Sequence, residues 1–179
     1  MRTILIASGI ILMAALSRLL PHPPNFTPLA AIALAGGVYM NKRLALVIPL
    51  AALLLSDAVL GFHRTMIFVY ASFVLTGFMG IWLKSHKRPL PVFGAALMSS
   101  VLFFIVTNFG VWLMQNGVAY PNSLPGLLEC YTAAIPFFRN TVLGDVVYTA
   151  VLFGVFETAE YGIRMLGKKE AVSREQTEA

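Results

Sequence analysis

A carboxylate at position 57 is the group in this sequence best placed to do chemistry. Asp57 follows the apolar run 51–56 and lies about one helical turn before that apolar segment ends. A carboxylate in such surroundings needs a partner, and three arginines are candidates: Arg18, Arg64 and Arg139. Two interpretations stay open: Asp57 contacts a ligand in an outward-facing pocket, or it forms an ion pair that fixes the helices.

A second carboxylate, Asp145, lies in a later apolar segment. Thr141, Asp145 and Tyr148 are spaced i, i+4 and i+7, so a helix would place them on one face. This spacing predicts a polar stripe that faces other helices, next to Arg139. The alternative is that Asp145 is stabilised by the dipole at the helix N-terminus and has no further role.

Two further residues stand out in an apolar run near the middle of the chain. Asn108 and Trp112 are spaced i, i+4. Asn108 is expected to form an interhelical hydrogen bond or a ligand contact, and Trp112 to do the same or to lie in an interfacial aromatic belt.

The sequence contains no sign of catalysis or metal binding. It has no HExxH, GxSxG or Walker A motif. Its three histidines are isolated, and Cys130, the single cysteine, is expected to be an inert thiol. We therefore expect no enzyme activity, cofactor or metal site.

The elements that must position these residues are apolar helices. Of the 179 residues, 58% are hydrophobic and 12% charged, against about 45–50% and 25% in soluble domains. A span needs about 20 residues, and six segments approach or exceed this length: Thr3–Leu20, Thr27–Met40, Leu44–Leu60, Met66–Leu83, Val92–Met114 and Thr141–Leu166. We predict an all-α integral membrane protein with six transmembrane helices in one bundle.

The charges orient this bundle. Ten Lys/Arg residues fall on the side of the chain ends, and three fall on the other side: Arg18, Arg64 and Arg139. The positive-inside rule then predicts cytoplasmic N- and C-termini in a bacterial inner membrane. The basic residues fall in short clusters between the apolar runs, and this pattern argues against nucleic-acid binding.

The segments outside the spans complete the expected organisation. The apolar stretch Gly126–Phe138 should form a short interfacial helix before the sixth span. Residues 1–166 are expected to be one transmembrane domain, and residues 167–179 a disordered charged cytoplasmic tail. The first apolar segment is interpreted as a retained helix, with a cleaved signal peptide as the alternative.

Small residues follow one another at a spacing of four in the second segment. Ala31 and Ala35, and Ala33 and Gly37, would form a face that permits close helix approach. That face either packs inside the chain or docks another membrane subunit.

Three stretches resemble a bacterial family of uncharacterised transport proteins. They are Arg18–Ala31 with its motif Pro21-His22-Pro23-Pro24-Asn25-Phe26, Ser56-Asp57, and Phe137–Asp145. That family is similar to the substrate-binding S components of energy-coupling factor (ECF) vitamin transporters, and the resemblance covers about residues 1–166.

The resemblance implies a pocket near the extracytoplasmic face that binds a vitamin-like molecule, and no ATPase in this chain. Coupled S components dock to a transmembrane partner, which works with ATPases, through small residues of the first helix. Here the first apolar segment lacks two alanines at a spacing of four, so a solitary transporter is also open.

We therefore expect a small-molecule uptake protein with its pocket on the outer side. Asp57, Arg139 and Asp145 would orient a polar or zwitterionic ligand, and Phe26, Tyr120 and Tyr131 would stack on a flat ring. The remaining expected contacts are His22, Asn25, His63, Arg64, Asn108, Trp112 and Asn140. The alternatives are a non-transporting structural or assembly subunit and, third, an intramembrane enzyme.

Overall fold

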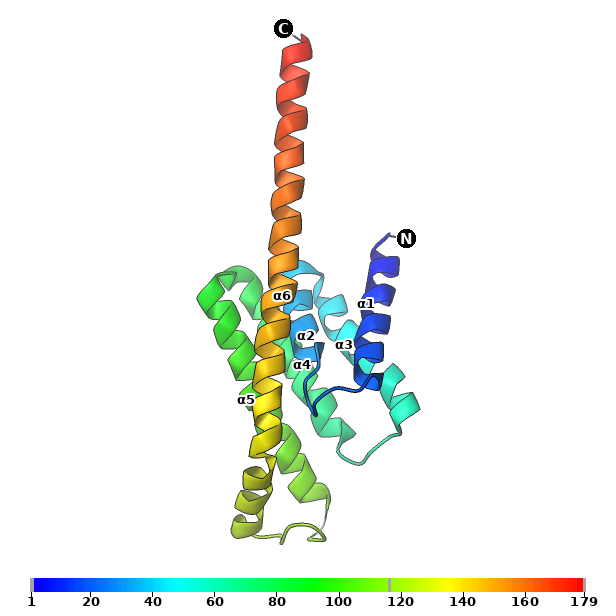
Figure 1. Cartoon of the computed structure of the whole chain (residues 1–179), viewed down its shortest axis with the longest axis vertical. Helices are drawn as coiled ribbons and strands as arrows, with labels where there is room; N and C mark the ends of the chain where they lie inside the picture. The colour runs from blue at the N-terminus through cyan, green and yellow to red at the C-terminus, as the bar shows by residue number, and fades with distance from the viewer. Residues whose placement is uncertain (1, 116, 179) are drawn as a thin grey trace.

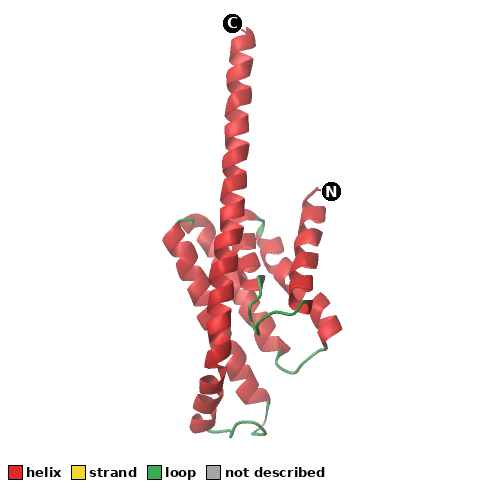
Figure 2. Ribbon diagram, viewed as in Figure 1, coloured by secondary structure: helices red, strands yellow, loops and turns green. Residues whose placement is uncertain are grey.

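The computed structural model describes the backbone of residues 2–115 and 117–178 and the side chains of residues 8–115, 117–162 and 164–165. Within these residues the chain forms six α-helices and one 3₁₀ turn and contains no strand. Figure 2 shows the helices joined by short loops. Their bounds are α1 (Arg2–Leu19), α2 (Leu29–Tyr39), α3 (Lys42–Leu60), α4 (Met66–Leu83), η1 (Lys84–His86), α5 (Pro89–Met114) and α6 (Leu124–Glu178).

The helices confirm the all-α class, and each of the six predicted segments overlaps one α-helix. The ends of α3 and α5 follow from local chemistry that hydropathy does not register. The Asn41 side chain caps α3 by accepting a hydrogen bond from the Leu44 backbone N–H at 2.8 Å. Pro89 begins α5, where a proline costs nothing because the first helical N–H has no partner.

The prediction of a separate interfacial helix before the sixth span is wrong. Residues 126–138 are the first part of α6, which runs without interruption from Leu124. Pro136 lies inside this helix and removes one backbone donor without ending it. At the other end the helix continues to Glu178. Disorder of residues 167–179 stays a prediction, because the side chains of 166–178 and the whole of residue 179 lie outside the described residues.

In the part of the chain that the structure describes, four helices are long and apolar enough to cross a membrane. They are the segments Lys42–Leu60, Met66–His86, Pro89–Met114 and Leu124–Gly162. Many large apolar side chains on them face outward, among them Val59, Ile67 and Met98. Serine, threonine and aspartate side chains are instead buried inside the bundle. This reversed polarity is that of a membrane-embedded protein, whose outer surface contacts lipid.

The short helix α2 lies at the centre of the bundle and packs on α3, α4, α5 and α6. Its 11 residues extend over roughly 16 Å, about half of the hydrocarbon thickness of a bilayer. The irregular segment 20–28 precedes it. In Figure 1 the start of α1 and the end of α6 lie toward the same end of the bundle, and the α5–α6 loop lies at the opposite end.

The small residues of α2 serve packing within the chain. Ala31, Ala33, Ala35 and Gly37 are buried, so Ala31, Ala35 and Gly37 do not offer the docking face considered above. Gly37 lies against Gly80 of α4 so closely that a Cβ atom on Gly37 would come within 2.2 Å of the Gly80 carbonyl carbon. Only glycine permits this crossing.

This crossing predicts a stability effect. Gly37→Ala should lower the free energy of unfolding by about 1–3 kcal/mol, because backbone atoms of α4 must move away. Thermal unfolding of the detergent-solubilised protein measures the effect. Gly94→Ala is the matched control, since nothing lies within 4 Å of a Cβ atom there. Equal unfolding temperatures for the two variants would contradict the close crossing.

Candidate functional site

A buried ion pair joins α1 to α3. The Arg18 guanidinium donates to Asp57 Oδ1 at 2.7 Å, to the Ser56 hydroxyl, and to the Leu53 carbonyl oxygen at 3.4 Å. Tyr70 of α4 donates its hydroxyl to the second carboxylate oxygen of Asp57 at 3.0 Å. Asp57 is only 1% exposed, so the ion pair replaces the water that this carboxylate loses.

The second carboxylate, Asp145, is held differently. Its side chain is 3% exposed and accepts hydrogen bonds at Oδ2 from Ser100 at 2.6 Å and from Ser99 at 3.4 Å, both on α5. No arginine, lysine or histidine among the described side chains forms a salt bridge with it. Asp57 is thus neutralised by a cation, whereas Asp145 is solvated by hydroxyl groups alone.

A cavity of about 250 Å³ lies between the two carboxylate systems. Arg18, Ser99 and Asp145 each contribute to its lining. Residues from all six α-helices and from the segment 20–28 line this cavity. The full lining is Arg18, His22, Asn25, Thr27, Leu29, Ala30, Leu53, Leu60, Val69, Phe73, Thr76, Ser99, Phe103, Thr141 and Asp145.

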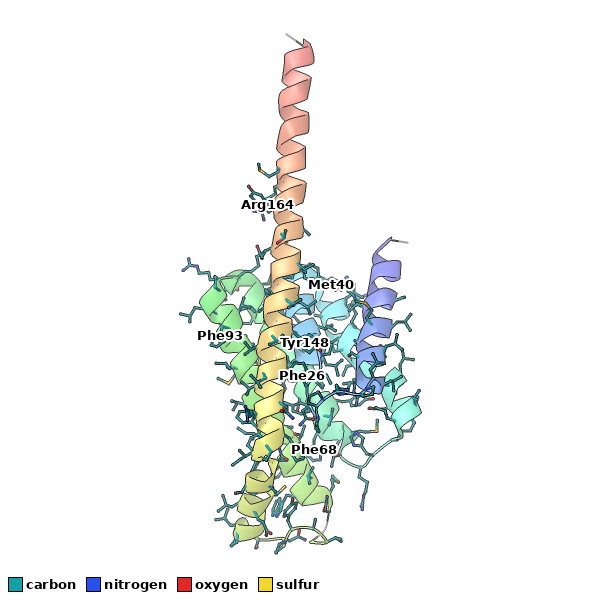
Figure 3. All side chains as sticks on the ribbon, in the orientation of Figure 1. Phe26, Met40, Phe68, Phe93, Tyr148 and Arg164 are labelled. Carbon is teal, nitrogen blue, oxygen red and sulfur yellow. The ribbon has the colours of Figure 1, made fainter. Side chains whose placement is uncertain are left out.

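The segment 20–28 reaches the cavity because it packs into the bundle. Asn25 adopts a left-handed conformation, with φ of 64°, which asparagine tolerates better than most residues. Gly144 of α6 lets Phe26 approach, since a Cβ atom on Gly144 would lie 3.2 Å from the Phe26 Cα. The Phe26 ring meets Tyr148 at a centroid distance of 5.4 Å, and Figure 3 shows these two rings next to each other against α6.

A smaller cavity of about 210 Å³ adjoins the first and shares Asn25, Val69, Phe103 and Thr141 with it. Asn108 lines this cavity and donates its amide to the Phe104 carbonyl at 2.8 Å. Asn108 thus lines the cavity adjacent to the one that Asp145 lines.

Several residues predicted to bind substrate lie elsewhere. Trp112 and Tyr131 donate to the carbonyl oxygens of Pro121 and Ile105, at 2.9 and 2.8 Å. Phe26, Asp57, Tyr120 and Asn140 do not line the two cavities. Asp57 contacts Arg18, which lines the first cavity, and Phe26 packs against Gly144. His63, Arg64 and Arg139 are exposed, so Arg139 does not join Asp57 and Asp145. Substrate contact stays a prediction for His22, Asn25, Asn108 and Asp145, all of which line a cavity.

Sequence reasoning missed the residues that complete the site. Ser99 and Ser100 hold Asp145, and Phe73, Thr76 and Phe103 line the cavity. The adjacent serines inside an apolar run were a usable signal, because serine in such a run is expected to meet a polar partner on another helix. The two phenylalanines carry no signal that separates them from the others.

A separate polar cluster lies at the opposite end of the bundle. Lys87 Nζ contacts Glu157 at 2.8 Å and Glu160 at 3.1 Å, and Glu160 also pairs with Arg164 at 3.2 Å. The hydrogen bond with Glu157 is the main cause that raises the pKa of Lys87. Glu160 and Arg164 are four residues apart on α6, the spacing at which ion pairs form on a helix surface. Among the described residues no three His, Cys, Asp or Glu side chains gather as a metal site would require.

The fold and the cavity define an all-helical, membrane-embedded protein with a cavity inside its helix bundle that apolar and a few polar side chains line. The chain belongs to a family of unknown function, DUF6580, whose model matches residues 1–166. The match covers the bundle and every residue of the candidate site. No curated protein and no solved structure matches the chain.

The ion pair predicts an asymmetric response to mutation. Asp57→Asn should lower the free energy of unfolding by about 3–5 kcal/mol, because it leaves the Arg18 charge without its partner in the bundle. The double variant Arg18→Met with Asp57→Asn should lose less than the sum of the single changes.

Arg164→Gln is the control for this cycle. It removes an exposed i, i+4 pair on α6 and should change stability by less than about 1 kcal/mol. Chemical unfolding in mixed micelles is measured for the unmodified protein, the two single variants, the double variant and Arg164→Gln. Strictly additive losses would show that Arg18 and Asp57 do not interact.

Proposed function

We propose that this protein binds a small organic molecule in the cavity at Arg18 and Asp145 and serves its uptake across the bacterial inner membrane. The observation that carries this proposal is a cavity to which every helix contributes and into which costly buried polar groups converge. Pockets of this kind, mostly apolar with a few placed polar groups, are typical of small-molecule sites.

The arrangement of charges supports an outward-facing cavity. In the proposed topology six helices cross the membrane, and both chain ends face the cytoplasm together with the basic residues of the short loops. The segment 20–28, which lines the cavity, then lies on the extracytoplasmic side. Irregular backbone at membrane depth is tolerated where it lines a cavity, and His22, Asn25 and Thr27 of this segment line one.

The likeness to ECF S components is part of the proposal and rests on fold-level analogy. It accounts for a small helical bundle with a ligand pocket and no nucleotide-binding motif. The burial of the α2 alanines removes one candidate surface for a coupling subunit. A solitary transporter and a transporter that docks through another face both agree with the structure.

Filling the cavity tests the proposal. Ala30 lines it and is buried, so Ala30→Leu should lower by at least tenfold the amount of any small molecule that co-purifies with the protein. Mass spectrometry of extracts from the purified protein measures this amount, and uptake of that molecule by expressing cells should fall in parallel.

The matched control is Ala150→Leu, which adds the same atoms to a different cavity of about 410 Å³ between α5 and α6. Ligand retention should match that of the unmodified protein. Equal retention by the Ala30 and Ala150 variants would refute the site. A stoichiometric protein partner without any small molecule would instead assign the chain to the structural or assembly class.

A further inference from the structure

The charge inside the cavity does not balance. Arg18 and Asp57 neutralise each other across 2.7 Å, so together they contribute no net charge. Asp145 lines the same cavity, and among the described residues no cation pairs with it. One buried carboxylate therefore faces the cavity with only hydroxyl groups as partners.

Hydrogen bonding around Asp145 is also one-sided. Oδ2 accepts from Ser99 and Ser100, and no described group donates to Oδ1. The nearby hydroxyls of Thr76 and Thr141 donate to backbone carbonyls of their own helices at 2.9 and 3.0 Å, which leaves their oxygen lone pairs available. This part of the cavity consequently presents acceptors and suits a ligand that brings donors or positive charge.

Two aromatic rings form part of the apolar lining of the same cavity. Phe73 and Phe103 both line the cavity, with ring centroids 5.5 Å apart and planes inclined at 52°. The faces of aromatic rings attract organic cations, most strongly where water is excluded. A carboxylate and two phenylalanine rings that line one cavity are a combination suited to an ammonium group with apolar substituents.

We propose that the ligand of this cavity is an organic monocation whose charged group pairs with Asp145 while its apolar part contacts Phe73 and Phe103. This inference rests on the proposed function and names the ligand class for the same site. A cation would neutralise the buried carboxylate, which is otherwise costly at membrane depth. An anionic ligand would add a second negative charge beside Asp145.

Pairs of probes that differ in charge test the inference on the unmodified full-length protein. Choline and its neutral isostere 3,3-dimethyl-1-butanol have nearly the same shape. Thiamine, nicotinate, pantothenate and riboflavin extend the series over cationic, anionic and neutral vitamins. Binding is measured by isothermal titration calorimetry in detergent, in potassium buffer. Choline or thiamine should bind at least tenfold more tightly than every neutral or anionic probe.

The variant Asp145→Asn tests whether the negative charge of Asp145 binds the cation. It keeps the shape and an acceptor for Ser100, and it should weaken cation binding at least tenfold. Glu129→Gln is the matched control, because it removes one carboxylate from an exposed position of the same helix and should leave binding unchanged. If Asp145→Asn does not fold, the comparison of choline with its isostere still decides.

Three results would overturn the inference. If a neutral or anionic probe binds most tightly, and Asp145→Asn binds it as tightly as the unmodified protein does, the ligand is not a cation. The uptake proposal would still stand. Stabilisation by sodium ions alone that requires Asp145 would assign the carboxylate to an inorganic cation. Absence of binding by every probe, while another small molecule co-purifies in a manner sensitive to Ala30→Leu, would exclude this ligand class without excluding the site.

Discussion

The salt bridge between Arg18 and Asp57 is the interaction on which the arrangement of this bundle depends. Helix α1 packs chiefly on α3, and the ion pair is a charged link between these two helices. Tyr70 extends that link to α4 through the same carboxylate. Where water is excluded, removing one partner of an ion pair is costly because the other charge is left without compensation. The pair therefore holds the C-terminal end of α1 against α3. It thereby also sets the position at which the segment 20–28 enters the bundle.

The hydropathy of the chain predicted the helices well because lipid imposes a simple rule on sequence. A segment such as Met66–Leu83, which contains no charged residue, forms a helix at membrane depth because its backbone groups must pair with one another, and the helix has these bounds. The rule says less where polar loops and apolar helices mix. Hydropathy predicts a separate short helix at Gly126–Phe138, whereas this stretch is the first part of one long helix that continues past Pro136.

The site was partly predictable for a related reason. Charged residues are rare in apolar runs, so the sequence alone indicates that Asp57 and Asp145 are candidate site residues. Arg18 is among the three arginines predicted as partners of Asp57. Which of three arginines pairs with Asp57 depends on helix rotation and tilt, which residue spacing within one helix does not determine. Arg139 precedes Asp145 by six residues and projects outward, because that separation on a helix is well away from the i+3, i+4 and i+7 positions that share a face.

The cavity itself follows from the shortness of α2. A helix of 11 residues cannot fill the centre of the bundle over the whole membrane thickness. Its place is taken by the segment 20–28, where prolines 21, 23, 24 and 28 withhold backbone donors and prevent a regular helix. Irregular backbone packs less evenly than a helix against flat helical neighbours, and space remains between it and α4, α5 and α6. The residues that break the helix are thus the same ones that make room for a ligand, and Asp145 lies in the wall of that space because α6 passes beside it.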